Sequence, residues 1–188
     1  EMKSLIIIGV AIFFGCSTKS LEKKIIKENR QVINQIQNVK ILMSRGGRAI
    51  RIGEISKDSI IPEDFMDEIY CLELNNKGKL TTYFGFGSIT IKNKKKNLFL
   101  NEIIKADTIY LQDKLCQKIL KIANRIYSRK EYFSDLFPTD SWLIKLQIND
   151  KTNIYHDCEF LNLKELNKDY IDIVNEIVKQ SIIKVDEW

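Results

Sequence analysis

The residues best able to do chemistry stand together in the run Tyr155-His156-Asp157-Cys158, which contains the only histidine of the chain. On a strand, residues two apart point to the same face, so His156 and Cys158 would face the same way. An imidazole and a thiol on one face could form half of a zinc site or a thiolate–imidazole pair. The alternative is a strand face that packs apolar residues, with the histidine hydrogen-bonded at its margin.

A zinc site at His156 would need further ligands from Cys71, Cys116 or carboxylates, and no spacing typical of a zinc motif supports them. The sequence therefore predicts no metal site and no cofactor. It also contains no G-x-S-x-G, H-E-x-x-H or Walker-type pattern. With one histidine, a Ser–His or Cys–His mechanism could use only His156. These patterns favour a non-enzymatic protein, and an enzyme with a site near His156 and Cys158 is the alternative.

The first sixteen residues have the layout of an export signal. Lys3 gives a basic start, residues 5–14 are apolar apart from Gly9, and Gly15 precedes Cys16. A helix that spans a bilayer needs about 20 apolar residues, whereas the apolar part of a secretory signal has about 7–15. Residues 1–15 are therefore predicted to be a signal peptide.

The sequence Phe13-Phe14-Gly15-Cys16 resembles a bacterial lipobox, the cleavage site of lipoprotein signal peptidase. It differs from the usual pattern by Phe13 in place of leucine and Phe14 in place of a small residue. The resemblance implies that Cys16 becomes the mature N-terminus and carries a diacylglycerol on its sulfur, and two or more acyl chains anchor a protein stably. We expect a lipoprotein of the cell membrane or outer membrane, bound to membrane lipid through Cys16, with its domain in the periplasm or on the cell surface.

Three more cysteines, Cys71, Cys116 and Cys158, would then meet an oxidising compartment in which a disulfide can persist. They allow one bridge and leave one thiol over. The sequence does not determine the pairing, and three buried free thiols are an equal alternative.

The charge pattern gives no sign of a nucleic-acid partner. The net charge is +5, from 30 basic and 25 acidic residues that are mixed along most of the chain. A nucleic-acid-binding protein usually gathers its basic residues on one face or helix. The one dense run, Lys92, Lys94, Lys95 and Lys96, is interpreted as a solvated turn or as a contact with an anionic membrane or partner surface.

Hydrophobic periodicity predicts both helices and strands. Residues 18–40 have a helical stripe and are predicted to form an anchor-proximal amphipathic helix or stalk, within a segment 16–40. A single domain, 41–188, follows. Strands are predicted at 39–44, 48–55, 68–74, 79–86, 88–92, 97–100, 141–148 and 152–160, and helices at 111–127 and 163–183. Strand 39–44 is predicted to pair with 48–55 in a hairpin, 68–74 with 79–86 across a turn at residues 75–78, and 88–92 with 97–100 across the lysine run. Short turns between strands give antiparallel sheet. The predicted fold class is α+β: an antiparallel sheet built from hairpins with helices packed on one face, preceded by an N-terminal helix.

The arrangement of turns also resembles a group of small uncharacterised bacterial lipoprotein domains. The residues that carry this resemblance are Asn76-Lys77-Gly78-Lys79, Phe84-Gly85, Thr139-Asp140 and Trp188. The group implies no activity. The sequence thus predicts a non-enzymatic binding domain for an envelope protein or a cell-wall component. A purely structural tether built on the 18–40 helix is a further alternative.

Overall fold

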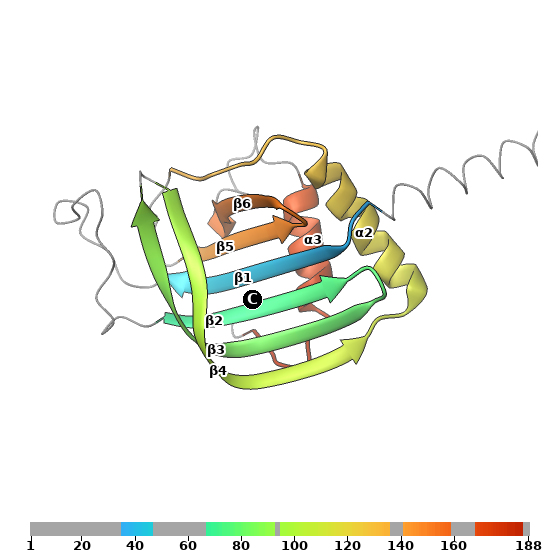
Figure 1. Ribbon diagram of the computed structural model, residues 1–188, viewed down its shortest axis with the longest axis horizontal. Helices are drawn as coiled ribbons and strands as arrows, with labels where there is room; N and C mark the ends of the chain where they lie inside the picture. The colour runs from blue at the N-terminus through green and yellow to red at the C-terminus, as the bar shows by residue number, and fades with distance from the viewer. Residues whose placement is uncertain (1–34, 47–66, 93–94, 136–140, 159–167, 186–188) are drawn as a thin grey trace, which may run out of the picture. The chain divides into compact units, whose positions relative to one another are not determined.

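The computed structural model describes residues 35–46, 67–92, 95–135, 141–158 and 168–185. They form a six-stranded antiparallel sheet and two helices (Figure 1), which confirms the predicted α+β class. The strand order is β4-β3-β2-β1-β5-β6. The elements are β1 (Asn38–Gly46), β2 (Asp67–Asn75), β3 (Lys79–Lys92), β4 (Lys95–Tyr110), α2 (Asp113–Tyr127), β5 (Ser141–Ile148), β6 (Lys151–His156) and α3 (Asp169–Val178).

Strand β1 lies in the middle of the sheet, between β2 and β5. Its ladder with β2 begins at Asn38 and its ladder with β5 at Val39, and residues on both of its faces are buried, Ile41 and Met43 on one and Leu42 on the other. Residues 38–40 are therefore strand, and the prediction of a helix as far as residue 40 is wrong at that end. The predicted pairing of 39–44 with 48–55 is also wrong, because β2 and β5 occupy both edges of β1. Residues 18–34 and 48–55 lie outside the described residues.

Two tight turns fix the register of the hairpins. Gly78 has a φ of +81°, which a residue without a Cβ adopts easily, and the Asn75 side chain accepts hydrogen bonds from the backbone N–H groups of Lys77 and Lys79. This confirms the predicted turn between β2 and β3. In the β5–β6 turn, Asn149 has a φ of +52°, and its Oδ1 accepts the backbone N–H of Gln37 at 2.8 Å. The second turn therefore also holds the start of β1.

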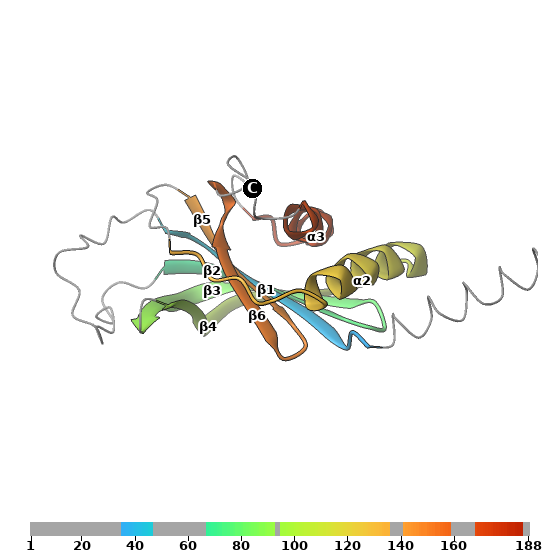
Figure 2. The same cartoon turned by 90° about the horizontal axis from the view of Figure 1, so that it is seen from above.

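Strands β3 and β4 form a long hairpin that bends over the sheet (Figures 1 and 2). The register between them shifts at Phe84/Gly85 and again at Phe86/Gly87. Beyond these shifts, Ile89 and Leu98 pack against Leu42 on the sheet face opposite the helices. The bent hairpin thus closes a small second core. The predicted hairpin of 88–92 with 97–100 is confirmed, but the sequence did not predict that β4 continues to residue 110.

Both helices cover the other face of the sheet (Figure 2). Helix α2 confirms the prediction for 111–127 within two residues. The described part of the C-terminal helix ends at Val178, so the predicted extension to 183 is wrong. Likewise β6 ends at His156, earlier than the predicted 160. The buried residues of the two helices are Cys116, Ile119, Leu120, Ile122, Ala123 and Ile126 in α2, and Asp169, Tyr170, Ile173, Val174, Ile177 and Val178 in α3.

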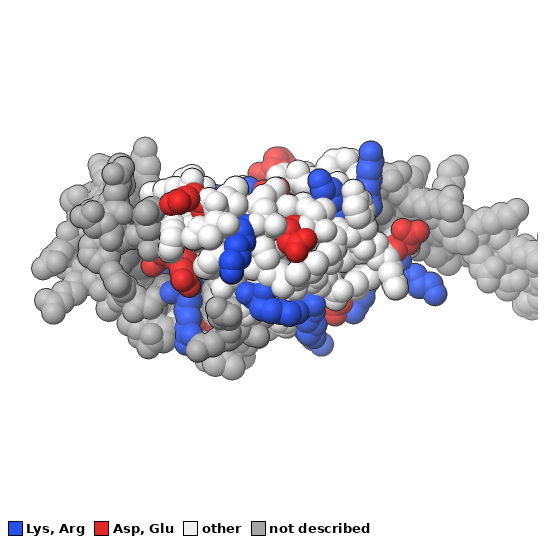
Figure 3. Space-filling view, turned by 90° about the horizontal axis from the view of Figure 1, so that it is seen from below, with Lys and Arg blue, Asp and Glu red and all other residues white. Residues whose placement is uncertain are grey.

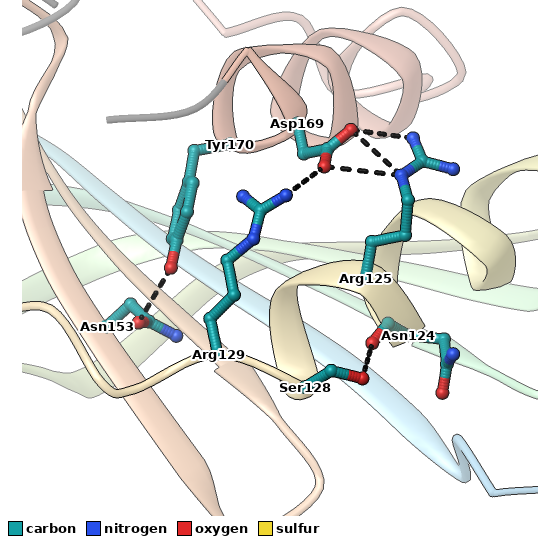
Figure 4. Close-up of polar contacts among 7 residues, drawn as sticks. All are labelled: Asn124, Arg125, Ser128, Arg129, Asn153, Asp169 and Tyr170. Carbon is teal, nitrogen blue, oxygen red and sulfur yellow. Dashed lines mark hydrogen bonds and ion pairs between the residues drawn. The ribbon is translucent and has the colours of Figure 1, made fainter. Parts of the chain in front are cut away.

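A charged cluster joins the two helices at one end (Figure 4). The buried Asp169 carboxylate at the start of α3 accepts a hydrogen bond from Arg125 at 2.6 Å and one from Arg129 at 2.8 Å. The hydrogen bond from Arg125 is the main cause that lowers the pKa of Asp169, and both arginine charges add to it. This cluster fixes α3 against the end of α2.

Candidate functional site

His156 lies at the end of β6 on the sheet face opposite the helices, the face that also carries Ile154. Its ring is buried. The Nδ1 atom lies 2.9 Å from the Ser141 hydroxyl of β5, and Nε2 lies 2.7 Å from the Lys96 Nζ of β4. The bent hairpin thus brings Lys96 to the far end of the sheet, and the three side chains form one buried hydrogen-bonded chain.

A serine beside a histidine can serve as a nucleophile if the ring nitrogen accepts its proton. In the well-known catalytic triads a carboxylate holds the other ring nitrogen. Here Lys96 takes that position, and a charged lysine can only donate a hydrogen bond. Nε2 must then be the acceptor, and the ring proton lies on Nδ1 and is donated to Ser141. This arrangement does not activate Ser141, and the geometry favours a buried polar link between strands.

The three cysteines whose pairing the sequence left open are free thiols. Cys71 is buried in β2, and burial raises its pKa to about 12 although the charge of Lys40 lowers it. Cys116 in α2 also has a raised pKa, mainly because of burial. Both are therefore poor nucleophiles.

The structure does not support the prediction that His156 and Cys158 share one face of a strand. Because β6 ends at His156, the alternation of a strand no longer applies two residues later. Within the described ranges, no group of three or more histidine, cysteine, aspartate or glutamate side chains gathers as a metal site would need. Cys16 lies outside those ranges.

On the sheet face opposite the helices, the part that the bent hairpin leaves open carries a polar groove of about 510 Å³. We call it the polar groove because most of its lining residues are polar: Asn38, Lys40, Glu73, Asn75, Lys79, Thr81, Tyr83, Gln147 and Asn149, beside the apolar Val39 and Leu74. The strand register aligns its floor, because Lys40 of β1 lies opposite Glu73 of β2 on one side and opposite Gln147 of β5 on the other. Its size falls within the range of small-molecule sites, about 300–1,000 Å³.

The floor of the polar groove is a row of cross-strand pairs. The Lys40 ammonium lies 2.7 Å from a Glu73 carboxylate oxygen. Burial lowers the pKa of Lys40, but the hydrogen bond to Glu73 and nearby negative charge raise it more, so the pKa is raised overall. Beside this pair, the Gln147 amide donates to Thr152 at 3.3 Å. The two central charges of the floor therefore neutralise each other.

A second surface runs along β4, the edge strand next to β3. Five large hydrophobic side chains are exposed in the described residues, and four of them belong to this strand: Phe99, Ile103, Ile104 and Tyr110. Figure 3 views the molecule from the side on which β4 lies in Figure 1, and shows a largely uncharged surface with acidic and basic side chains at intervals. Exposed apolar side chains that gather on one element are typical of interaction sites.

The opposite edge of the sheet is covered. A segment after α2 runs beside β6, where the backbone N–H of Ile154 donates to the Tyr132 carbonyl and that of Ser134 donates to the Ile154 carbonyl, each at 2.8 Å. Such cover prevents an edge strand from pairing with other chains. Only β4 leaves a long edge open among the described strands.

Comparison with models of known protein families and with curated proteins finds no match to this chain. In the described ranges, no helix has the length and apolar character needed to cross a membrane.

Sequence reasoning named His156 but missed both open surfaces. The groove floor consists of Lys40, Glu73 and Gln147, which lie far apart in sequence and meet only through the strand order. The segment that became the second half of β4 did carry a signal, because the β-branched and aromatic residues Thr108, Ile109 and Tyr110 are typical of strands.

Proposed function

We propose that this chain is a membrane-anchored envelope lipoprotein whose domain is a non-enzymatic binding module. The observation that carries the binding role is the set of four exposed apolar side chains on β4, Phe99, Ile103, Ile104 and Tyr110, which we call the apolar row on β4. Such a row on an open sheet edge offers a partner both apolar surface and unpaired backbone groups. The alternative of an enzyme near His156 and Cys158 has less support. The contact with Lys96 places the ring proton of His156 on Nδ1, the nitrogen beside Ser141, so the imidazole cannot accept the proton of that hydroxyl.

A partner segment would bind this edge by strand addition, in which its backbone continues the sheet and its side chains contact those of β4. The register shifts near Ile103 and Ile104 interrupt the regular ladder, so the regular part from residue 106 to 110 offers the better pairing site. The two isoleucines would then supply apolar contact beside the added strand. Each Å² of apolar surface removed from water stabilises such a complex by about 25 cal/mol.

Photo-crosslinking in living cells tests the binding role. The crosslinking residue p-benzoylphenylalanine replaces Tyr110, and we expect a discrete adduct whose yield falls several-fold when Ile103→Ser is added. Ile182→Ser is the matched control, because Ile182 is 56% exposed and Ile103 is 55% exposed. Equal yields from the two serine variants, or no adduct, would refute a partner site on β4.

The anchor is tested on its own by intact mass and detergent-phase partitioning of the wild type beside Cys16→Ala. We expect cleavage before Cys16, added acyl mass and transfer to the detergent phase in the wild type alone. Two proteins that both stay uncleaved and unacylated would remove the lipoprotein proposal and leave the β4 experiment standing.

A further inference from the structure

The polar groove has the hydrogen-bonding capacity of a ligand site. Each cross-strand pair on its floor uses only part of what its side chains offer. In the described part of the chain, the contacts leave the Gln147 carbonyl oxygen, the second Glu73 oxygen Oε2 and the Tyr83 hydroxyl without a protein partner. The Lys40 ammonium carries three N–H donors, of which Glu73 takes one. The floor therefore offers a ligand both hydrogen-bond donors and acceptors.

The charge of the groove fits an uncharged ligand. Lys40 and Glu73 neutralise each other at 2.7 Å, and the flanking side chains Thr81, Tyr83 and Gln147 are uncharged. A multiply charged anion would lie close to the Glu73 carboxylate, and a multivalent cation would lie close to the Lys40 ammonium, so a strongly charged ligand of either sign meets a like charge. The remaining charged residue of the lining, Lys79, is an exposed residue that begins β3.

The groove lies on a face of the sheet, where backbone groups are already used by the β-ladders. A peptide that binds by strand addition needs an open edge with free backbone groups, which this face does not offer. A ligand here must be recognised by side chains alone, through many hydroxyl-type hydrogen bonds. Tyr83 adds an aromatic ring, one side of which packs against the second core. Sugars combine hydroxyls at the ring edge with C–H groups on the ring faces, and they match such a surface.

We propose that the polar groove binds an uncharged saccharide, with Gln147, Glu73 and Lys40 as hydrogen-bonding partners and Tyr83 as an aromatic wall. This site is separate from the apolar row on β4, and it does not depend on the protein partner proposed there.

The test is calorimetric titration of the full chain in a detergent without a sugar headgroup, with the neutral probes chitotetraose and maltotetraose. We expect at least one probe to bind with a Kd of about 1 mM or tighter. Gln147→Ala should weaken binding at least about fivefold, because it removes a donor and an acceptor from the floor. The matched control is Gln112→Ala, since Gln112 is exposed and its side chain makes no capping hydrogen bond.

Tyr83→Phe keeps the ring that packs on the second core, so it separates loss of ligand contact from loss of folding. We expect it to weaken binding less than Gln147→Ala does. The proposal is overturned if neither probe binds at about 10 mM, or if Gln147→Ala binds as tightly as Gln112→Ala. It is also overturned if pentaglycine or heparin displaces the bound oligosaccharide from this site. Unchanged binding in Ile103→Ser would show that the groove acts independently of β4.

Discussion

A histidine beside a serine can act as a base or form a structural hydrogen bond. At His156, the residue that contacts the other ring nitrogen, Nε2, decides between these two roles. That neighbour is Lys96, which lies sixty residues away in sequence and reaches His156 only because the β3–β4 hairpin bends. If a carboxylate stood in place of this lysine, it would accept a hydrogen bond from the ring and orient the imidazole for catalysis. One side chain thus separates two interpretations of the same Ser–His pair.

The thiols differ in their surroundings, which gives a prediction about their reactivity. Cys71 is buried with a pKa of about 12, whereas Cys158 is half-buried. At pH 8 Cys71 is therefore almost entirely in the thiol form, whereas the thiolate is the form that reacts. In native Cys16→Ala protein we therefore expect a thiol reagent such as DTNB to modify Cys158 first and Cys71 last. The same protein, denatured without reductant, should release three thiols. A count of one would show a disulfide.

At the level of the elements, glycines allow the bend of the long hairpin. A Cβ at Gly85 would overlap the backbone carbonyl of Glu102, and a Cβ at Gly87 would overlap that of Phe99. Close approach of the two backbones is thus possible only where the side chain is absent. The bend in turn places Leu98 over the second core and Lys96 beside His156.

We expect Gly85→Ala to lower the free energy of unfolding by about 2 kcal/mol or more, because a backbone carbonyl cannot move away cheaply. Ser88→Ala on the same strand is the control and should change it by no more than about 0.5 kcal/mol. Urea unfolding of the three proteins measures both. Equal stabilities would mean that the bend does not depend on the glycine.

The contact between α2 and α3 predicts a dependence of stability on pH. The pKa of Asp169 is lowered from 3.8, mainly by the hydrogen bond from Arg125. A lowered carboxyl pKa stabilises the fold at pH values above the ordinary pKa, and this stabilisation is lost as the pH falls through the lower folded value. Acid should therefore weaken the contact only below about pH 4.

Asp169→Asn should cost about 1–2 kcal/mol at pH 7, a modest value because the Arg125 partner is half-exposed. The difference from wild type should shrink between pH 4 and pH 2. Asp135→Asn, at an exposed position, serves as the control at each pH. Urea unfolding at pH 7 and pH 3 checks this, and a difference that stays constant would contradict it.

At the level of the whole molecule, the compact unit runs from Ile36 to Trp188. Ile36 is fully buried, and β1 is paired along both edges. One face of the sheet packs against the helices and the other is divided between the small second core and the polar groove. The two open surfaces thus lie on different parts of the same sheet.

Two truncations test the boundary of this unit. A chain that begins at Gln35 keeps all of β1, and we expect its Tm to stay within about 3 °C of the full chain. A chain that begins after Gly46 loses the central strand and should not fold, because β2 and β5 would have no common neighbour. Circular dichroism melting curves compare the three chains. A large loss in the first truncation would place part of the core before residue 35.

The sequence by itself determined the local elements of this protein. The turns at Asn75–Gly78 and Asn149, the alternation in 141–148 and the stripe in 111–127 depend on neighbours in the chain, and each was predicted close to its observed place. The layout of residues 1–16 likewise predicts an anchor at Cys16, which stays a prediction.

Only the tertiary structure decided which strands are neighbours and what packs against each face of the sheet. Strand β1 pairs with β2 and β5 instead of 48–55, because pairing at long range is selected by the burial of whole faces and not by the nearest turn. The floor of the polar groove follows from that strand order, and the Lys96–His156 contact follows from the bend at Gly85. Both depend on residues distant in sequence, whose proximity no local pattern encodes.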